Sequence, residues 1–183
     1  MTLVIGSLWE EDLTILKDFI LNNSDINIII APHEIGEDNI LSILKSLENK
    51  PVLYSKLSNS NSNILIIDCI GKLTSIYSIA DIAYVGGAFG KGLHNILEPA
   101  TYGVPVIFGP KFNKFQEAID LVNLKGCFVI SSKSEAENML TQLITDETQR
   151  KRAGQLSFDY VSDKAGATVK VMEYLDQYLV DER

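Results

Sequence analysis

The feature of this sequence that most constrains its fold is a series of short, continuous apolar runs, rich in isoleucine and valine and bounded by turn residues. A strand with one solvated face would alternate apolar and polar residues, so continuous apolarity means that both faces are covered. This pattern is typical of a parallel sheet between two layers of helices. The runs that we expect to form strands are residues 3–5, 26–31, 52–54, 64–67, 82–85, 104–108 and 127–130.

Segments with helical periodicity separate these runs. Strand and helix alternate along most of the chain, which predicts an α/β fold with a doubly wound, mostly parallel sheet. In such a sheet a ligand binds outside the carboxyl ends of the strands. A Ser/Asn-rich stretch at 58–63 is expected to be a surface loop. The expected helices are 10–22, 38–48, 73–80, 95–102, 114–124 and 134–145, followed by a helical tail at 147–179.

Length and charge narrow the class of protein. The 183 residues, 46% of them hydrophobic, suit one globular domain spanning 1–183. A formal net charge of -8 argues against nucleic acid as a partner, because binding to phosphate backbones needs clustered Lys and Arg. Any anionic ligand must therefore be held by a local site. The apolar runs fall far short of the roughly 20 residues of a membrane helix, so this chain by itself is expected to be soluble.

The stretch that reads YVGGAFGKGLHNILEPATYGVPVIFGP, residues 84–110, holds the candidate ligand site. Loops that only connect elements are usually shorter and plainer. Glycines at 86, 87, 90 and 92 let the backbone come close to a bulky group, and the helix that follows points unsatisfied N–H groups at it. Together these features suit an anion.

Two polar residues in this stretch have two interpretations. Asn95 and Glu98 have the spacing of a helix N-cap and its reciprocal partner, which would explain both without a ligand. Alternatively, the Glu98 carboxylate accepts hydrogen bonds from two neighbouring hydroxyls, as a ribose presents them. The glycines favour the nucleotide interpretation. The Walker phosphate motif is excluded by spacing, and the nearest dinucleotide pattern has Asn95 where its last glycine should be.

Five motifs, in order, resemble the carboxy-terminal half of 3-deoxy-D-manno-octulosonate (Kdo) transferases. That family has the two-domain GT-B glycosyltransferase architecture, in which this Rossmann-like half binds the donor CMP-Kdo. The similarity covers most of the chain and implies a donor-binding domain whose N-terminal acceptor domain is absent. A chain that enters a strand directly after Met1 fits this expectation. The motifs are GSLWEED at 6–12, AP with a following His at 31–33, ADIAYVGGAFG at 80–90, HNILEPA at 94–100, and GVPVIFGP with a following Phe, Gln and Glu at 103–117.

The resemblance also implies roles for individual residues. Glu98 would hold the ribose hydroxyls, and the turn through His94 and Asn95 would admit the CMP phosphate to the helix start. No catalytic residue and no cofactor is expected in this chain, and the two histidines lack the companions that a metal site needs. The residues expected to contact CMP-Kdo or CMP are Ser7, Pro32, His33, Gly87, Ala88, Phe89, Gly90, His94, Asn95 and Glu98.

The sequence departs from the family pattern at several of these positions. Leu8 stands where a threonine is common, and Pro32 is followed at once by His33, without the arginine often found between them. A cationic phosphate contact is therefore in doubt. Lys91 and Lys111 sit in the expected site loops, either as solvated side chains or as charges that offset a phosphate or a sugar carboxylate.

The reaction implied is inverting transfer of Kdo to a lipid A precursor (lipid IVA) in lipopolysaccharide core biosynthesis. The general base would lie in the missing domain, so the chain alone is expected to be inactive. The full-length enzyme would work at the cytoplasmic face of the inner membrane. Two other hypotheses stay open: half of a GT-B enzyme that uses a UDP-sugar, and a non-catalytic nucleotide-binding module.

Overall fold

The chain folds around one parallel sheet, as expected from the apolar runs. The computed structural model describes residues 1–48, 50–57 and 61–180. The strand order is β3-β4-β2-β1-β5-β6-β7 and every pair is parallel. Residues 58–60 of the expected surface loop lie outside the described part. The strands are β1 (Thr2–Leu8), β2 (Asn27–Pro32), β3 (Val52–Leu53), β4 (Ile64–Ile66), β5 (Ile82–Val85), β6 (Val106–Phe108) and β7 (Cys127–Val129).

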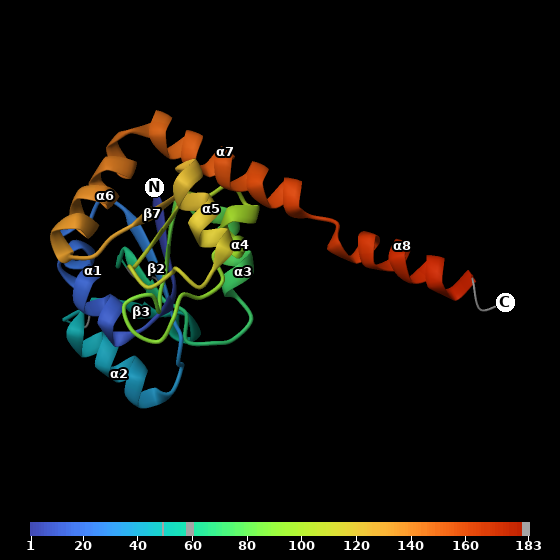
Figure 1. The fold of residues 1–183 in the computed structure, drawn as a ribbon. Helices are drawn as coiled ribbons and strands as arrows, with labels where there is room; N and C mark the ends of the chain where they lie inside the picture. The colour runs from blue at the N-terminus through green and yellow to red at the C-terminus, as the bar shows by residue number, and fades with distance from the viewer. Residues whose placement is uncertain (49, 58–60, 181–183) are drawn as a thin grey trace.

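Helices cover both faces of this sheet. Figure 1 shows α1, α2 and α6 on one side, with α3, α4 and α5 on the other. This doubly wound arrangement confirms the predicted fold class. The helices are α1 (Glu10–Asn22), α2 (Glu37–Ser46), α3 (Leu73–Ile76), α4 (Leu97–Thr101), α5 (Gln116–Leu124), α6 (Lys133–Thr145), α7 (Glu147–Lys164) and α8 (Ala167–Val180), with 3₁₀ turns at η1 (Tyr54–Lys56) and η2 (Tyr77–Ile79).

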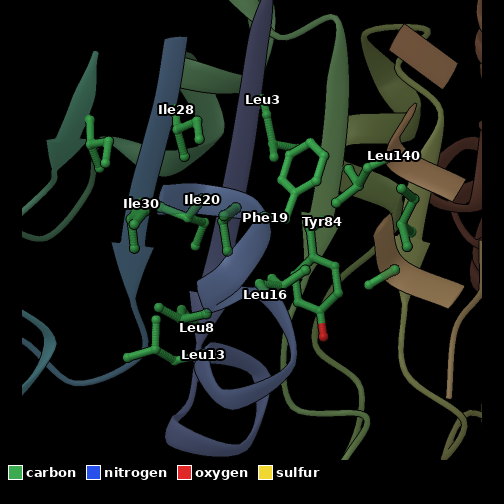
Figure 2. Close-up of a cluster of buried hydrophobic side chains, with 14 of the residues drawn as sticks. Leu3, Leu8, Leu13, Leu16, Phe19, Ile20, Ile28, Ile30, Tyr84 and Leu140 are labelled. Carbon is green, nitrogen blue, oxygen red and sulfur yellow. The ribbon is translucent and has the colours of Figure 1, made fainter. Parts of the chain in front are cut away.

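The core explains why the strands read as continuous apolar runs. Alternate residues of β1 face opposite layers. Leu3 (Figure 2) and Ile5 belong to the cluster that contains the buried residues of α1, while Val4 packs with Tyr77 on the other face. All of these side chains are buried. Each strand must therefore be apolar at every position, and period-2 alternation cannot appear.

Some predicted helices are shorter in the structure or interrupted. The expected helix at 73–80 is the single turn α3 followed by the 3₁₀ turn η2, and the expected helix at 114–124 begins at Gln116. The tail at 147–179 is two helices, because Ala165 is extended and Gly166 has φ 97°. Figure 1 shows α8 projecting away from the sheet. No helix in the described ranges is both long and apolar enough to cross a membrane.

The first strand is longer than predicted, and its glycine has a specific packing role. Gly6 lies within β1 and pairs with Ala31, rather than forming the turn into α1. A Cβ at this position would overlap the Tyr77 hydroxyl. The chain instead leaves the strand through an irregularity at Ser7, which has the left-handed value φ 52°.

Candidate functional site

The site lies where the strand order reverses. The connection from β1 leads to β2 on one side of the sheet, whereas β5 adds to the opposite edge of β1. The loops after β1 and β5 therefore lie next to each other at the carboxyl ends of two adjacent strands, where ligands bind in open α/β sheets. The candidate site is therefore the switch-point crevice typical of this fold class, between the segments Ser7 to Trp9 after β1 and Gly86 to Ile96 after β5.

Asp12, in the first turn of α1, joins these two loops. Its Oδ2 atom accepts hydrogen bonds from the backbone N–H groups of Trp9 at 3.1 Å and Gly87 at 2.8 Å. Its Oδ1 atom accepts the hydroxyl of Tyr84 at 2.6 Å, and that hydroxyl points to the carboxyl end of the sheet in Figure 2. Burial raises the pKa of this carboxyl group, while the three hydrogen bonds lower it.

The glycine-rich loop folds back on itself in a narrow space. Gly87 has φ 95°, and a Cβ there would overlap the carbonyl of Gly92. The carbonyl of Gly87 itself accepts hydrogen bonds from the backbone N–H groups of Gly90 at 3.1 Å and Gly92 at 2.9 Å. A Cβ at Gly86 would overlap the carbonyl of Ser7. The glycines thus bring the two loops into contact, which is the close backbone approach expected from the sequence.

An aromatic cluster of Trp9, His33 and His94 lies on this crevice. The indole of Trp9 stacks on His33, with ring centroids 4.2 Å apart, and donates from Nε1 to Nε2 of His94 at 3.0 Å. The His33 and His94 ring centroids are 4.4 Å apart. Because Nε2 of His94 accepts the indole proton, the neutral ring carries its own proton on Nδ1 and can donate it to a ligand.

The environment of His94 predicts a pH dependence of stability. Burial lowers the pKa of His94, and the neighbouring His33 lowers it further, against the opposing charge of Asp12. A histidine with a depressed folded-state pKa takes up its proton first in the unfolded chain. The free energy of unfolding should therefore fall as the pH drops below about 6.5, the usual pKa of histidine.

Urea unfolding at pH 7.5 and pH 5.0 measures this effect in the native chain and in His94→Gln. The native chain should lose more stability between the two pH values than the variant, since only the native chain has this group to titrate. An equal loss in both would show that His94 is not held in its neutral form.

Glu98 lies in the first turn of α4 and bonds two neighbouring side chains. One carboxylate oxygen, Oε2, accepts the hydroxyl of Thr74 at 2.9 Å, and Oε1 accepts the side-chain amide of Asn95 at 3.1 Å. Each oxygen thus accepts one hydrogen bond from the protein, and the residue is only partly buried. The carboxylate is therefore held in place and still has free lone pairs for a diol.

The start of α4 differs from the prediction. The helix begins at Leu97 rather than Asn95, and the buried Ile96 is its N-cap residue. Asn95 still caps it, because its Oδ1 accepts the N–H of Leu97 at 3.0 Å. However, Glu98 bonds the Asn95 side chain, not its backbone, so the predicted reciprocal capping box does not form. A phosphate would have to displace Asn95 to reach this amide.

All ten predicted contact residues lie on the loops and element ends around this crevice, but with unequal exposure. Pro32, Gly87 and Ala88 are buried, so they shape the backbone. His33 and Asn95 are exposed. The half-buried residues, whose surfaces a ligand could reach, are Ser7, Phe89, Gly90, His94 and Glu98.

Three residues that support the site were not identified from the sequence. Asp12 looks like an ordinary acid of a helix first turn, and Thr74 lies in a different segment from the carboxylate that it bonds. In the sequence, Trp9 is most simply a packing residue, whereas in the structure it stacks on His33 and donates a hydrogen bond to His94. The only sequence signal that could have indicated Asp12 is its place as an acid in the first helical turn after a strand.

A cavity of about 430 Å³ opens beside the glycine loop. It lies between the loops after β5 and β6. Lys91 and Lys111, whose roles the sequence left open, both line it, and the backbone N–H of Lys111 donates to the carbonyl of Ala88 at 2.9 Å. Lys114 joins them. Within the described residues, no group of three or more His, Cys, Asp or Glu side chains is placed to hold a metal ion.

Sequence comparison gives relatives over most of the chain. It is 29% identical over 178 residues to the 3-deoxy-D-manno-octulosonic acid transferase of Haemophilus influenzae, covering 92% of this chain and 42% of that protein. It is 31% identical over 156 residues to the enzyme of the same name from Chlamydia trachomatis serovar D, covering 81% and 36%. The chain thus spans about two fifths of the length of these relatives. No protein-family model matches it.

Structural comparison agrees on the fold. The C-terminal CMP-Kdo binding domain of WaaA from Acinetobacter baumannii superimposes with a TM-score of 0.76 at 20% sequence identity, covering 87% of this chain and 88% of that domain. WaaG, a glycosyltransferase involved in lipopolysaccharide biosynthesis, matches with a TM-score of 0.60 at 14% identity, over 88% of this chain and 42% of its own. The chain has the fold of the C-terminal domain of a GT-B glycosyltransferase.

Proposed function

Because this chain is a sequence relative of the 3-deoxy-D-manno-octulosonic acid transferases and has a GT-B C-terminal fold, we propose that it is the donor-binding domain of such an enzyme. Residues 1–183 bind the CMP-Kdo donor as one domain. An N-terminal acceptor domain of the same enzyme completes the active site. The relatives are more than twice as long as this chain, which supports the proposal that a second domain completes the enzyme.

The observation that carries this proposal is the order of groups along the loop after β5. Glu98 presents a fixed carboxylate, His94 a ring N–H, and Gly92 an open stretch of backbone, where an added Cβ would meet nothing within 4 Å. A nucleotide sugar has ribose, phosphate and sugar in that same order. We therefore assign the ribose hydroxyls of CMP to Glu98 and the phosphate to the vicinity of His94.

The phosphate position proposed here differs from the one expected from the sequence, which was the start of α4. The first amide of that helix is occupied by Asn95, whereas His33 and His94 lie next to the crevice with donors available. Their imidazoles replace the arginine that is absent after Pro32. Ser7 borders the same space, and Pro32, Gly87 to Gly90 and Asn95 set its shape.

In the proposed reaction, a lipid A hydroxyl attacks the anomeric carbon of Kdo and CMP leaves. This chain binds the departing phosphate by hydrogen bonds and thereby stabilises its growing charge. The general base that removes the proton belongs to the N-terminal domain, so the chain contributes no catalytic residue. We place the whole enzyme in lipopolysaccharide core synthesis at the cytoplasmic face of the inner membrane, with a lipid A precursor as acceptor.

Calorimetric titration and a radiolabelled transfer assay test this division of labour. The chain should bind CMP more tightly than UMP or UDP and should transfer no sugar from CMP-Kdo to the lipid acceptor. Preference for UDP would support a GT-B enzyme that uses a UDP-sugar, and absence of nucleotide binding would support an interaction module. Measurable transfer by this chain would refute the assignment of the base to the other domain.

A further inference from the structure

Three lysines gather around one cavity in an otherwise acidic chain. Lys91, Lys111 and Lys114 are all exposed and line the cavity of about 430 Å³ between the loops after β5 and β6. This volume lies within the range of about 300–1,000 Å³ that small-molecule sites occupy. The chain carries a formal net charge of -8 and holds only 16 lysines and arginines, so three at one opening make a local positive field.

Within the described part of the chain, none of these lysines forms a salt bridge. The ion pairs formed within the described residues are Lys50 with Glu48, Lys133 with Asp18, and Lys151 with Glu147. None of them involves a lysine of this cavity. The acid on its rim is Glu11, which lies against Gly90: a Cβ on that glycine would come 2.7 Å from Oε1 of Glu11.

The cavity continues from the nucleotide site. Lys91 lies over the Trp9 ring, with Nζ 5.6 Å from the ring centroid, and Trp9 itself stacks on His33. Gly90 and Gly92 line the cavity and belong to the same loop as His94. A ligand with its phosphate at the histidines would therefore extend its next group past Lys91 into this space.

We infer that the cavity of Lys91, Lys111 and Lys114 is the subsite for the carboxylate of an acidic sugar, and that it selects sugar acids over neutral sugars. This inference rests on the proposed function, since it takes the nucleotide to be bound at Glu98 and His94. In CMP-Kdo the carboxylate is attached to the anomeric carbon, next to the phosphate. A neutral sugar would leave the three ammonium groups without a counter-charge.

The lysines are suited to this role because an ammonium is a compact charge with three donors on a flexible stem. A hydrogen bond between charged groups is shorter and stronger than one between neutral groups. The loop after β6 carries two of the three lysines, so it contributes to sugar selection without touching the nucleotide.

Titration of one set of variants with two ligands tests the inference. The Lys91→Gln, Lys111→Gln and Lys114→Gln triple variant of the full chain is titrated with CMP-Kdo and with CMP. The variant should bind CMP-Kdo at least about tenfold more weakly than the native chain, and CMP within about threefold of native. Lys45→Gln, the same type of substitution at one exposed lysine of α2, should affect neither ligand.

Three results would overturn the inference. Equal weakening of both ligands would assign the lysines to the phosphate, unchanged binding of both would leave the cavity without a role, and a native chain that binds CMP-Kdo no better than CMP would mean that the sugar makes no net favourable contact. In each of these cases CMP still binds, so the proposed nucleotide site stands. Absence of CMP binding in the native chain is the separate result that refutes the proposed function and this inference with it.

Discussion

Replacing Asp12 with alanine is expected to lower the free energy of unfolding by about 3–5 kcal/mol. The carboxylate is fully buried and accepts the N–H groups of Trp9 and Gly87 and the hydroxyl of Tyr84. Alanine removes all three acceptors at once, and a buried donor without a partner costs about 1–3 kcal/mol. Urea unfolding of the native chain and the variant measures the difference.

Two controls separate the hydrogen bonds from simple loss of volume. Asp12→Asn keeps one oxygen for the two backbone donors and removes the cost of burying a charge, so it should lose less than half as much stability as alanine. Tyr84→Phe removes one hydroxyl and should cost about 1–2 kcal/mol. Alanine and asparagine variants of equal stability would show that Asp12 does not hold the two loops through these bonds.

The second large effect is expected at Glu98. Glu98→Ala should weaken the binding of CMP by at least about 100-fold, because two hydrogen bonds from ribose hydroxyls to a charged acceptor are lost, each worth about 1.5–3 kcal/mol. The fold should persist, since the side chain is partly exposed and bonds only the side chains of Thr74 and Asn95. Calorimetric titration gives the affinity, and thermal unfolding checks the fold.

A double comparison with 2′-deoxy-CMP isolates the ribose contact. The native chain should bind the deoxy ligand more weakly than CMP, and Glu98→Ala should discriminate little between the two ligands. Thr74→Val, which removes one bond that orients the carboxylate, should give an intermediate loss of CMP affinity. If the alanine variant discriminated between the ligands as strongly as the native chain, Glu98 would not contact the 2′ hydroxyl.

The sequence predicted the sheet well because its signal is local. A strand buried on both faces must be apolar throughout, so the seven runs from residue 3 to residue 130 stand out from their neighbours. The helical tail was less well predicted. Its periodicity continues through Ala165 and Gly166, whereas the break depends on the left-handed φ of that single glycine.

The candidate site was predictable only in part, because only its local features leave a signal in the sequence. The glycine loop and the Asn95-to-Glu98 spacing are contiguous in the sequence. By contrast, Asp12 meets Gly87 across 75 residues, and Trp9 meets His94 across 85. Such contacts depend on strand order, which brings β1 beside β5. The lysine cavity likewise combines two loops and leaves no motif in the sequence.

A crystal structure of this chain with bound CMP would show which groups hold the nucleotide. We expect the ribose hydroxyls within hydrogen-bonding distance of Glu98 and the phosphate next to His94 and His33, with the lysine cavity open beyond it. Cytidylate bound elsewhere, for example in the hollow between α1 and α2 that Trp9 and Asn39 line, would contradict this expectation.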